Sequence, residues 1–256
     1  AHMPRLIHTV AEWRSSHDEH RRAGRTIGFV PTMGALHAGH ASLFQAARRD
    51  HAVVLVSVFV NPTQFDEAHD FEKYPRALAA DLAVMDASGV DVVFAPTVAG
   101  MYPNGTRYAV TENEFSRELC GAHRPGHFAG MLTVVLKLLQ VARADAAYFG
   151  EKDYQQLLLI RGMVEAFFIE TRIVACPTVR EPDGLALSSR NARLSPYERA
   201  RAPTVLRALL TASTAAAASA QLRSAGFVVD YVEDRDGRRF GAVRLGSTRL
   251  IDNVTI

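Results

Sequence analysis

Cysteine is scarce in this sequence. The 256 residues include only Cys120 and Cys176, which lie far apart and belong to no CxxC pair. This scarcity argues against a disulfide framework and against a thiolate zinc site. It is typical of a reducing compartment, so we expect a cytoplasmic protein.

Long hydrophobic runs and an excess of one charge are also missing. No stretch reaches the roughly 18 apolar residues of a membrane-spanning helix, so no membrane span is expected. The 29 basic and 27 acidic residues give a net charge of +2, which implies no bulk attraction to nucleic acid or to a membrane surface. The first residues lack a signal-peptide pattern, and we interpret Ala1-His2-Met3 as an expression scar.

Short apolar strands alternate with helical segments through the first two-thirds of the chain. Residues 52–60 form a near-continuous β-branched run, which is typical of a central parallel strand buried on both faces. The alternation predicts an α/β fold: a doubly wound, mostly parallel, Rossmann-like sheet over residues 1–177. The expected strands are 26–30, 52–60, 90–95, 146–149 and 169–175, the expected helices are 8–23, 39–50, 76–88, 128–143 and 153–167, and residues 99–113 are expected to be irregular.

The pattern changes after about residue 177. A polar loop at 178–194 is followed by a helical region at 196–224 and then by alternating segments. Asp236-Gly237 between two such segments is a hairpin signal. These features predict a smaller C-terminal α+β domain over residues 178–256.

The strand at 26–30 leads through a turn into a helix that carries His37 and His40 in an HxGH motif. A turn containing glycine lets the backbone approach a ligand, and the free N–H groups of a helix start favour an anion. Histidines three residues apart lie on one side of a helix and can donate to phosphate oxygens. An arbitrary pair is more often a solvated residue and a packing residue, and zinc is disfavoured because no third ligand lies at a diagnostic spacing. The preceding strand favours the phosphate interpretation.

Two clusters carry cations that suit phosphate. Lys152 lies at a strand-to-helix junction, where it could face a phosphate or form a surface ion pair with Glu151 or Asp153. The loop at 187–191 offers hydroxyl groups and the Arg190 guanidinium, whose fork matches phosphate oxygens. A polar linker is the alternative explanation of this loop.

Uncharged amides follow the most hydrophobic strand. Asn61 and Gln64 suit a substrate with hydroxyl or carboxylate groups, although turn chemistry around Pro62 explains Asn61 adequately but not Gln64. Residues 124–128 indicate mainly a turn that caps a helix or contacts a ligand. Because active groups of α/β sheets gather at the carboxyl ends of strands, we expect these clusters to converge.

Six motifs occur in the order that is typical of one family. Together the chain resembles the pantothenate synthetase (pantoate–β-alanine ligase) family from about residue 26 to its end, with a wider similarity to HxGH nucleotidyltransferases. The motifs are Pro31-Thr32-Met33-Gly34-Ala35-Leu36-His37-Ala38-Gly39-His40, Phe59-Val60-Asn61-Pro62-Thr63-Gln64-Phe65, Tyr74-Pro75-Arg76, Arg124-Pro125-Gly126-His127-Phe128, Phe149-Gly150-Glu151-Lys152-Asp153-Tyr154-Gln155-Gln156 and residues 179–191.

The resemblance implies a ligase that uses ATP. Pantoate and ATP would give pantoyl adenylate and pyrophosphate, and β-alanine would then displace AMP to give pantothenate. The first step spreads negative charge over phosphate oxygens, and preorganised donors and cations lower its barrier. The resemblance further implies Mg²⁺ bridging the phosphates, with Asp81 as a candidate contact, and a homodimer. The C-terminal domain would close over the ATP site.

The resemblance also implies roles for individual residues. Four would be catalytic: His40, His37, Lys152 and Arg190. Three would bind pantoate or β-alanine: Gln64, Gln156 and Asn61. The ATP site would comprise Met33, Gly34, Ala35, Leu36, His37, Ala38, Gly39, His40, Gly150, Glu151, Lys152, Asp153, Val179, Leu187, Ser188, Ser189 and Arg190.

Two other functions stay open from the sequence. A nucleotidylyltransferase acting on a small phosphorylated substrate would share the HxGH chemistry, although it gives no reason for Gln64 and Gln156. A non-catalytic nucleotide-binding regulator would share the binding clusters. Release of free AMP would favour the ligase, and pantoate-dependent ATP–pyrophosphate exchange would separate it from the regulator.

Overall fold

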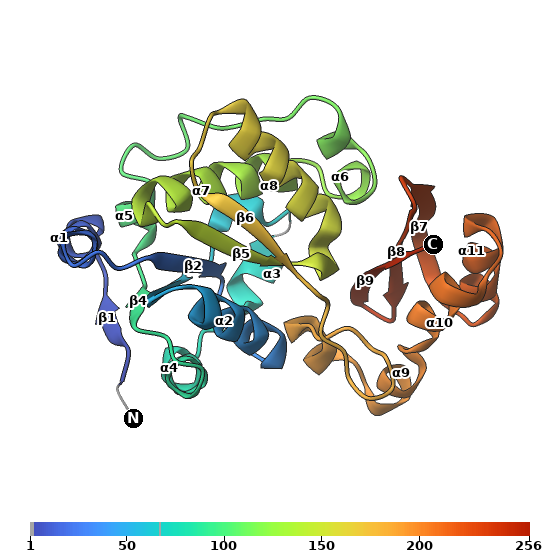
Figure 1. Ribbon diagram of the computed structural model, residues 1–256. Helices are drawn as coiled ribbons and strands as arrows, with labels where there is room; N and C mark the ends of the chain where they lie inside the picture. Colours follow the sequence, from blue (N-terminus) through green and yellow to red (C-terminus); the bar gives the residue numbers. More distant parts are fainter. Residues whose placement is uncertain (1–2, 67) are drawn as a thin grey trace. The chain divides into compact units, whose positions relative to one another are not determined.

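A computed structural model describes residues 3–66 and 68–256 (Figure 1). Ala1 and His2 of the interpreted expression scar lie outside the described residues. The chain divides into two compact units. The first contains the described residues up to Gly150 together with Gln156–Cys176, and the second contains Glu151–Gln155 and Pro177–Ile256. Glu151–Gln155 thus groups with the C-terminal part of the chain, whereas the sequence placed it in the first domain.

The first unit is built on a parallel sheet of six strands in the order β1-β4-β3-β2-β5-β6. Because β3 and β4 extend the sheet to one side of β2, and β5 and β6 to the other, the topology switches between β2 and β5. The strands are β1 (Arg5–Ile7), β2 (Ile27–Thr32), β3 (Val53–Val58), β4 (Val92–Phe94), β5 (Ala146–Gly150) and β6 (Arg172–Cys176).

Helices cover both faces of this sheet, as the doubly wound pattern predicts. In Figure 1, α2 and α4 lie on one face, and α7 and α8 lie on the other. The helices of the first part of the chain are α1 (Val10–Arg22), α2 (Ala38–Asp50), α3 (Ala68–Lys73), α4 (Leu78–Ala87), α5 (Val98–Met101), α6 (Cys120–His123), α7 (His127–Ala142) and α8 (Tyr154–Ala166), with short 3-10 turns at Pro62–Gln64, Phe115–Arg117 and Glu151–Asp153.

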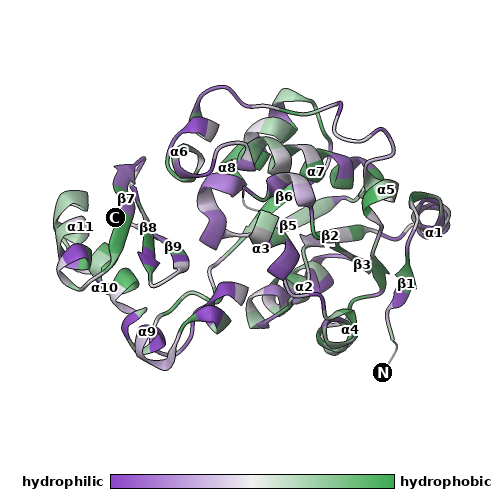
Figure 2. Cartoon of the chain, turned by 180° about the vertical axis from the view of Figure 1, so that it is seen from behind, coloured by the Kyte–Doolittle hydropathy of each residue, from purple (hydrophilic) through white to green (hydrophobic). Residues whose placement is uncertain are grey.

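One part of the core of the first unit lies between β2, β3 and β4 and the helices α2 and α4. Val54 and Val56 of β3 are fully buried, together with Phe44 of α2 and Met85 of α4. Figure 2 shows β3 as largely hydrophobic along the ribbon. Burial on both faces explains why these strands are runs of Val and Leu rather than alternating sequences.

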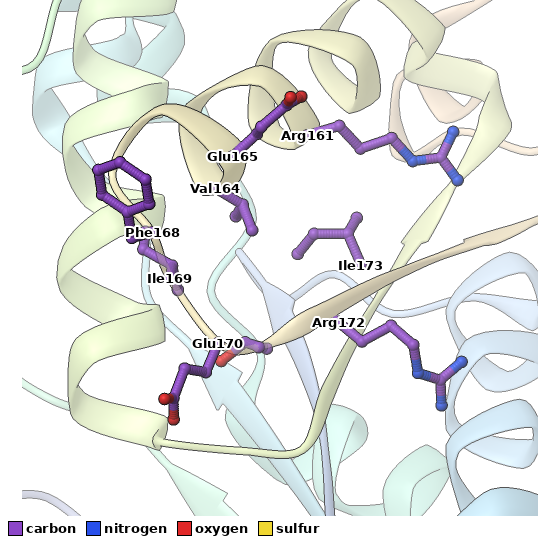
Figure 3. Close-up of a pocket in the computed structure, with 9 residues that line it drawn as sticks. Arg161, Val164, Glu165, Phe168, Ile169, Glu170, Arg172 and Ile173 are labelled. Carbon is purple, nitrogen blue, oxygen red and sulfur yellow. The ribbon is translucent and has the colours of Figure 1, made fainter.

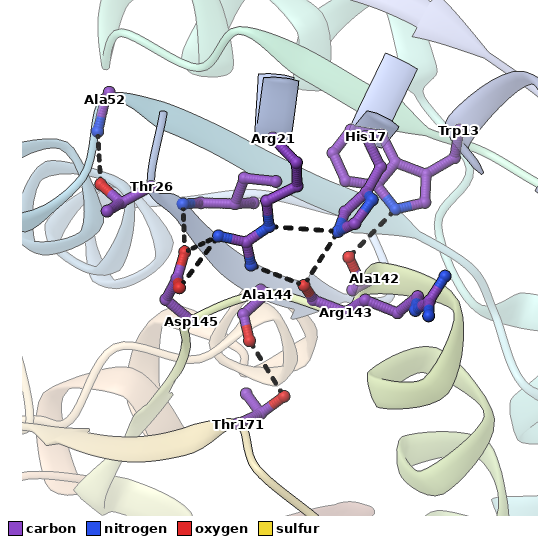
Figure 4. Close-up of polar contacts among 11 residues, drawn as sticks. Trp13, His17, Arg21, Thr26, Ala52, Ala142, Arg143, Ala144, Asp145 and Thr171 are labelled. Carbon is purple, nitrogen blue, oxygen red and sulfur yellow. Dashed lines mark hydrogen bonds and ion pairs between the residues drawn. The ribbon is translucent and has the colours of Figure 1, made fainter. Parts of the chain in front are cut away.

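Helix α1 is fastened to the sheet by polar contacts, of which the one from Trp13 is buried (Figure 4). Trp13 is fully buried and its Nε1 donates to the carbonyl of Ala142 at 3.1 Å. Arg21 donates to both carboxylate oxygens of Asp145 at 3.0 and 2.9 Å. Asp145 in turn accepts from the backbone N–H of Ile27 at 2.7 Å. These bonds join α1 to the end of α7 and to the start of β2.

The second unit packs three helices on an antiparallel sheet of order β7-β8-β9. Asp236 and Gly237, both with positive φ (48° and 74°), connect β7 to β8 between the paired residues Arg235 and Arg238, so the expected hairpin is confirmed. The elements are α9 (Pro196–Arg201), α10 (Thr204–Thr211), α11 (Ala215–Ser224), β7 (Val228–Arg235), β8 (Arg238–Leu245) and β9 (Thr248–Thr255), preceded by a 3-10 turn at Ser189–Arg193.

Two local expectations were wrong. The strand β1 precedes the strand that the sequence placed first, and it pairs with β4 at the sheet edge. The region expected to be irregular from residue 99 begins inside α5, whose Thr97 side chain accepts from the backbone N–H of Gly100. The expected helical region at 196–224 is confirmed and consists of three helices, which Pro203 and the extended Ala212 separate.

Candidate active site

The turn after β2 leads into α2 at the switch point of the sheet. Gly34 and Ala35 have positive φ (80° and 53°), which is strained for alanine. Thr32 supports the turn, because its Oγ1 accepts from the backbone N–H of Gly34 at 3.2 Å and donates to the carbonyl of Ser57 at 2.8 Å. The left-handed turn places His37 at the N-cap of α2.

Asp81 of α4 holds this turn from the side. Its carboxylate is only 3% exposed and accepts from the backbone N–H groups of Ala35 (3.2 Å) and Leu36 (2.9 Å). A Cβ atom on Gly34 would lie 2.9 Å from the Asp81 carboxylate oxygen, so the glycine leaves room for that carboxylate. Asp81, proposed from the sequence as a metal contact, is instead engaged with backbone of the histidine turn.

The two histidines bind each other's backbone. His37 Nδ1 accepts from the N–H of Gly39 at 3.1 Å, and His40 Nδ1 accepts from the N–H of His37 at 3.3 Å. Their ring centroids lie 4.2 Å apart. Because Nδ1 accepts in both rings, each neutral imidazole carries its proton on Nε2. The two hydrogen bonds thus place a proton on Nε2 of each ring at the start of α2.

Several backbone N–H groups of this turn have partners inside the protein. Gly34 donates to Thr32, Ala35 and Leu36 donate to Asp81, and His37 and Gly39 donate within the histidine pair. Binding of an anion at the start of α2 stays a prediction, for which the histidine side chains and the positive end of the helix dipole are candidates.

A second polar group follows β3, next to β2 in the sheet. Asn61 is only 1% exposed, and its Oδ1 accepts from the hydroxyl of Tyr102 at 2.6 Å. Its Nδ2 donates to the carbonyl of Gly130 (3.2 Å) and to Oε1 of Gln64 (2.9 Å). Burial raises the pKa of Tyr102, so this hydroxyl keeps the proton that it donates. Both donors of Asn61 are used inside the protein.

Gln64 differs from Asn61 in having an unused donor. Its Oε1 accepts from Asn61, whereas its Nε2 group makes no hydrogen bond to a described residue of the chain. The half-buried Gln64 side chain is thus oriented by Asn61 with its N–H donors left for a ligand. Turn chemistry explains Asn61, whose Oδ1 also accepts from the backbone N–H and the hydroxyl of Thr63, and it does not explain Gln64.

Helix α7 supports this turn through a close backbone approach. A Cβ on Gly130 would lie 2.1 Å from the carbonyl oxygen of Thr63, so only glycine permits the observed packing. His127 Nδ1 lies 2.7 Å from the carbonyl of Gln64. Arg124 forms an ion pair with Asp66 at 3.1 Å. The motif at 124–128 therefore packs against the Asn61–Gln64 turn. The sequence predicted a turn at 124–128 but not this contact.

The remaining candidates of the first unit lie close by in the fold. Gly150 ends β5, the strand that pairs with β2 on the side away from β3. Gln156 lies half-buried in the first turn of α8. The carboxyl ends of β3, β2 and β5 are neighbours in the sheet, so this part of the expected convergence is present in the structure.

The second unit contains the predicted cations. Lys152 lies in the turn Glu151–Asp153, whose backbone carbonyls accept from Asn253 of β9. No carboxylate within residues 3–66 and 68–256 forms an ion pair with Lys152, which removes the surface-pair interpretation in this structure. The convergence of Lys152 with the histidine turn stays a prediction.

The loop at 179–191 is held by backbone bonds and by β9. Leu187 donates to the carbonyl of Val179 at 3.0 Å. Arg180 donates to both carboxylate oxygens of Asp252 at 2.6 and 2.9 Å. The Ser188 hydroxyl accepts from the N–H of Arg190 at 3.2 Å, as the N-cap of the 3-10 turn that contains Ser189 and Arg190. A loop fixed by this many hydrogen bonds is unlike a flexible polar linker.

A groove of about 400 Å³ lies at the opposite end of the strands. It is lined by the end of α8 and the start of β6, including Arg161, Glu165, Phe168 and Arg172 (Figure 3). None of the residues expected to bind substrates lines it. Because polar groups of an α/β site gather at the carboxyl ends of strands, we do not assign this groove to the active site.

The sheet and its polar turns define the class of the protein: a doubly wound α/β protein with its candidate site at the switch point, where nucleotides commonly bind. The chain belongs to the pantoate-beta-alanine ligase family, whose model matches residues 5–255. The resemblance and the fold class inferred from the sequence are thereby confirmed. Within the part of the chain that the structure describes, no helix has both the length and the apolar character required to cross a membrane.

Relatives match over almost the whole chain. The pantothenate synthetase of Bdellovibrio bacteriovorus is 56% identical over 236 residues, which is 92% of this chain and 94% of that one. The enzyme of Legionella pneumophila strain Lens is 47% identical over 248 residues, 97% of this chain and 98% of that one.

Two solved structures agree with the fold. The pantoate-beta-alanine ligase of Francisella tularensis, complexed with beta-gamma ATP and beta-alanine, has a TM-score of 0.93 at 41% identity, covering 98% of this chain and 97% of that one. The pantothenate synthetase of Thermus thermophilus has a TM-score of 0.89 at 42% identity, covering 98% of this chain and 99% of that one.

Proposed function

We propose that this protein is the ligase that condenses pantoate with β-alanine to give pantothenate, using ATP. The observation that carries the proposal is the family match over residues 5–255. In the first step the pantoate carboxylate attacks the α-phosphorus of ATP, and pyrophosphate leaves. In the second step the β-alanine amine attacks the acyl carbon of pantoyl adenylate, and AMP leaves. ATP, pantoate and β-alanine are the small-molecule partners.

The histidine turn is proposed to hold the phosphates. The Nε2–H groups of His37 and His40 are fixed by the two Nδ1 bonds, so they can donate to oxygens whose charge grows in the transition state. His40 would serve the α-phosphate and His37 the ATP phosphates more generally. Residues 33–40 would line the nucleotide site, with Ala35 and Leu36 positioned by Asp81 rather than donating through their own amides.

The second unit is proposed to supply positive charge and adenosine contacts. Lys152 and Arg190 would neutralise phosphate charge in the adenylation step. Ser188 and Ser189 would contact phosphate, since the Ser188 hydroxyl accepts from the N–H of Arg190 as a cap and keeps its own proton to donate. Glu151, Asp153, Val179 and Leu187 would hold adenosine or shape its pocket, together with Gly150 of the first unit.

The turn that contains Asn61 and Gln64 is proposed to bind pantoate. Gln64 would donate through Nε2, with Gln156 as a second amide contact. Asn61 would act by orienting Gln64, since its own donors bind Gly130 and Gln64. Gln64 would also lie near β-alanine.

Mg²⁺ is proposed to enter with ATP, bridging phosphate oxygens as part of the nucleotide substrate. Asp81 does not fit as its ligand, because both carboxylate oxygens hold backbone N–H groups. In residues 3–66 and 68–256 no group of three or more His, Cys, Asp or Glu side chains is arranged to hold a metal, so the phosphates would supply most of its contacts. A cytoplasmic homodimer is part of the same proposal, and light scattering tests the dimer.

Pantoate-dependent exchange of pyrophosphate into ATP tests the first step. We expect exchange in the native protein and a loss of about 10²–10³-fold for His40→Ala, the usual cost of removing one transition-state donor. His123→Ala, an exposed histidine at the end of α6, is the matched control. Native exchange without pantoate, or a nucleotidyl product in place of free AMP, would contradict the ligase assignment. Near-native exchange in His40→Ala would remove His40 from the step.

A further inference from the structure

The last strand of the chain binds the backbone of the Lys152 turn. Nδ2 of Asn253 donates to the carbonyl oxygens of Glu151 and Lys152, both at 2.9 Å. Asn253 lies on β9 and is only 5% exposed. The side-chain amide of Asn253 thus uses both its protons to bind two consecutive carbonyl groups. These carbonyls belong to a 3-10 turn of only three residues, Glu151–Asp153.

The orientation of this amide is set by a cation. Oδ1 of Asn253 accepts from Nη1 of Arg238 at 2.6 Å, and the Arg238 guanidinium lies 3.8 Å from the ring centroid of Tyr154. A guanidinium can only donate, so Oδ1 must face Arg238 and Nδ2 must face the carbonyls. The amide cannot be exchanged for its flipped form without losing all three bonds.

The preceding residue on β9 fixes a second segment. Asp252 is 6% exposed and binds both Nη atoms of Arg180, and its Oδ1 also accepts from the backbone N–H of Asn253. Consecutive residues of one strand therefore hold the Lys152 turn and the segment that begins at Val179. Both of these lie in the nucleotide site that we propose.

We propose that Asn253 is a positioning residue that sets the place of the Lys152 ammonium in the nucleotide site. The inference rests on the proposed function, because it assumes that Lys152 contacts ATP phosphates. Lys152 has a long flexible side chain, and no described carboxylate pairs with it. Its position is therefore determined by where its backbone is held. Asn253 touches no reacting atom in this scheme and acts only through the turn.

A double-mutant cycle tests the inference. Equilibrium binding of β,γ-methylene ATP is measured by ligand-observed NMR, which reads weak affinities, in the full-length protein. We expect Asn253→Ala to weaken binding and to slow pantoate-dependent exchange by about 10- to 100-fold, since a displacement of about 1 Å can cost this much. In a Lys152→Ala background the same substitution should change nucleotide affinity by less than about twofold, because the positioned group is gone.

Two further variants separate positioning from folding. Asn253→Asp keeps the size of the side chain and the acceptor for Arg238 but removes both donors, so it should reproduce the loss seen in Asn253→Ala. Asn104→Ala changes an exposed turn asparagine and should leave binding and exchange unchanged. Circular dichroism and thermal melting confirm that each variant is folded, and Asn253→Asp replaces Asn253→Ala in the cycle if the latter is unfolded.

The outcomes are distinct. An equal loss in both backgrounds would overturn the inference, because Asn253 would then act through general stability. Native affinity in both Asn253 variants would overturn it as well. Native affinity and exchange in Lys152→Ala would refute the proposed role of Lys152, and the inference with it. Absence of exchange in the native protein would refute the proposed function itself.

Discussion

Asp81→Asn should damage the histidine turn while leaving the fold in place. The substitution keeps the shape of the side chain but leaves one acceptor where the carboxylate has two. In the native protein, the backbone N–H groups of Ala35 and Leu36 donate to the two carboxylate oxygens of Asp81 at 3.2 and 2.9 Å. One of these groups would face an NH₂ donor instead, inside a site where Asp81 is almost fully buried.

The magnitude follows from the lost bond. A hydrogen bond to a charged group contributes about 1.5–3 kcal/mol, and a buried donor left without a partner costs a similar amount. We therefore expect the free energy of unfolding to fall by about 2–4 kcal/mol, against a total of about 5–15 kcal/mol for a typical domain. Asp81→Ala would lose both bonds and open a cavity, so the asparagine variant is the sharper test.

Activity should fall more than stability suggests. Without the second bond the strained turn at Gly34 and Ala35 relaxes, and His37 and His40 move with it. We expect pantoate-dependent exchange to fall by about 100-fold, the usual scale for a displacement near 1 Å. Urea unfolding measures the stability and isotope exchange measures the step.

Asp86→Asn is the matched control, because it removes the same charge from the same helix at a side chain that makes no hydrogen bond to a described residue. It should leave both measurements near the native values. If Asp81→Asn behaved like Asp86→Asn, the carboxylate would not hold the turn. A loss of stability with native exchange would show that the turn tolerates the change.

Two further predictions concern Gln64 and His51. Gln64→Ala should raise the KM for pantoate by at least about tenfold and the KM for ATP by less than about twofold; a larger effect on ATP in steady-state kinetics would remove Gln64 from the pantoate site. Burial lowers the pKa of His51 below its ordinary value of 6.5, and within the described residues neither ring nitrogen has a hydrogen-bond partner. Near this pH the unfolded chain binds a proton on His51 more readily than the folded chain does. The free energy of unfolding therefore falls as the pH drops below about 6.5. His51→Leu should reduce this acid loss in thermal melts relative to the native protein, with no such change above pH 7; identical profiles would contradict it.

Local patterns in the sequence predicted most of the first unit because its strands are buried on both faces. Residues 53–58 are apolar almost without interruption, and such runs identify a parallel strand with no knowledge of its neighbours. The strand β1 was not predicted, because its three residues, Arg5–Ile7, are too few to show an alternation of apolar and polar side chains. Its strand character depends on pairing with Val92–Phe94, which only the folded chain supplies.

The same distinction applies to the candidate site. His37, His40, Gln64 and Lys152 are found from motifs, because each follows a strand within a few residues. The role of Asp81 could not be read from its helix, since its partners lie 45 and 46 residues earlier. Likewise, Asn253 has no local signal, because a strand asparagine near a chain end is usually a surface residue.

The bonds from Asn253 to the Lys152 turn join residues 102 and 101 positions apart. During synthesis at about 5–20 residues per second, the Lys152 turn would wait roughly 5–20 s for its partner strand. The six-stranded sheet is complete once Cys176 has emerged, so a nascent chain can hold a finished parallel sheet while its lysine is still unplaced. The ability to bind a nucleotide would thus be acquired after the sheet has formed, late in the synthesis of the chain.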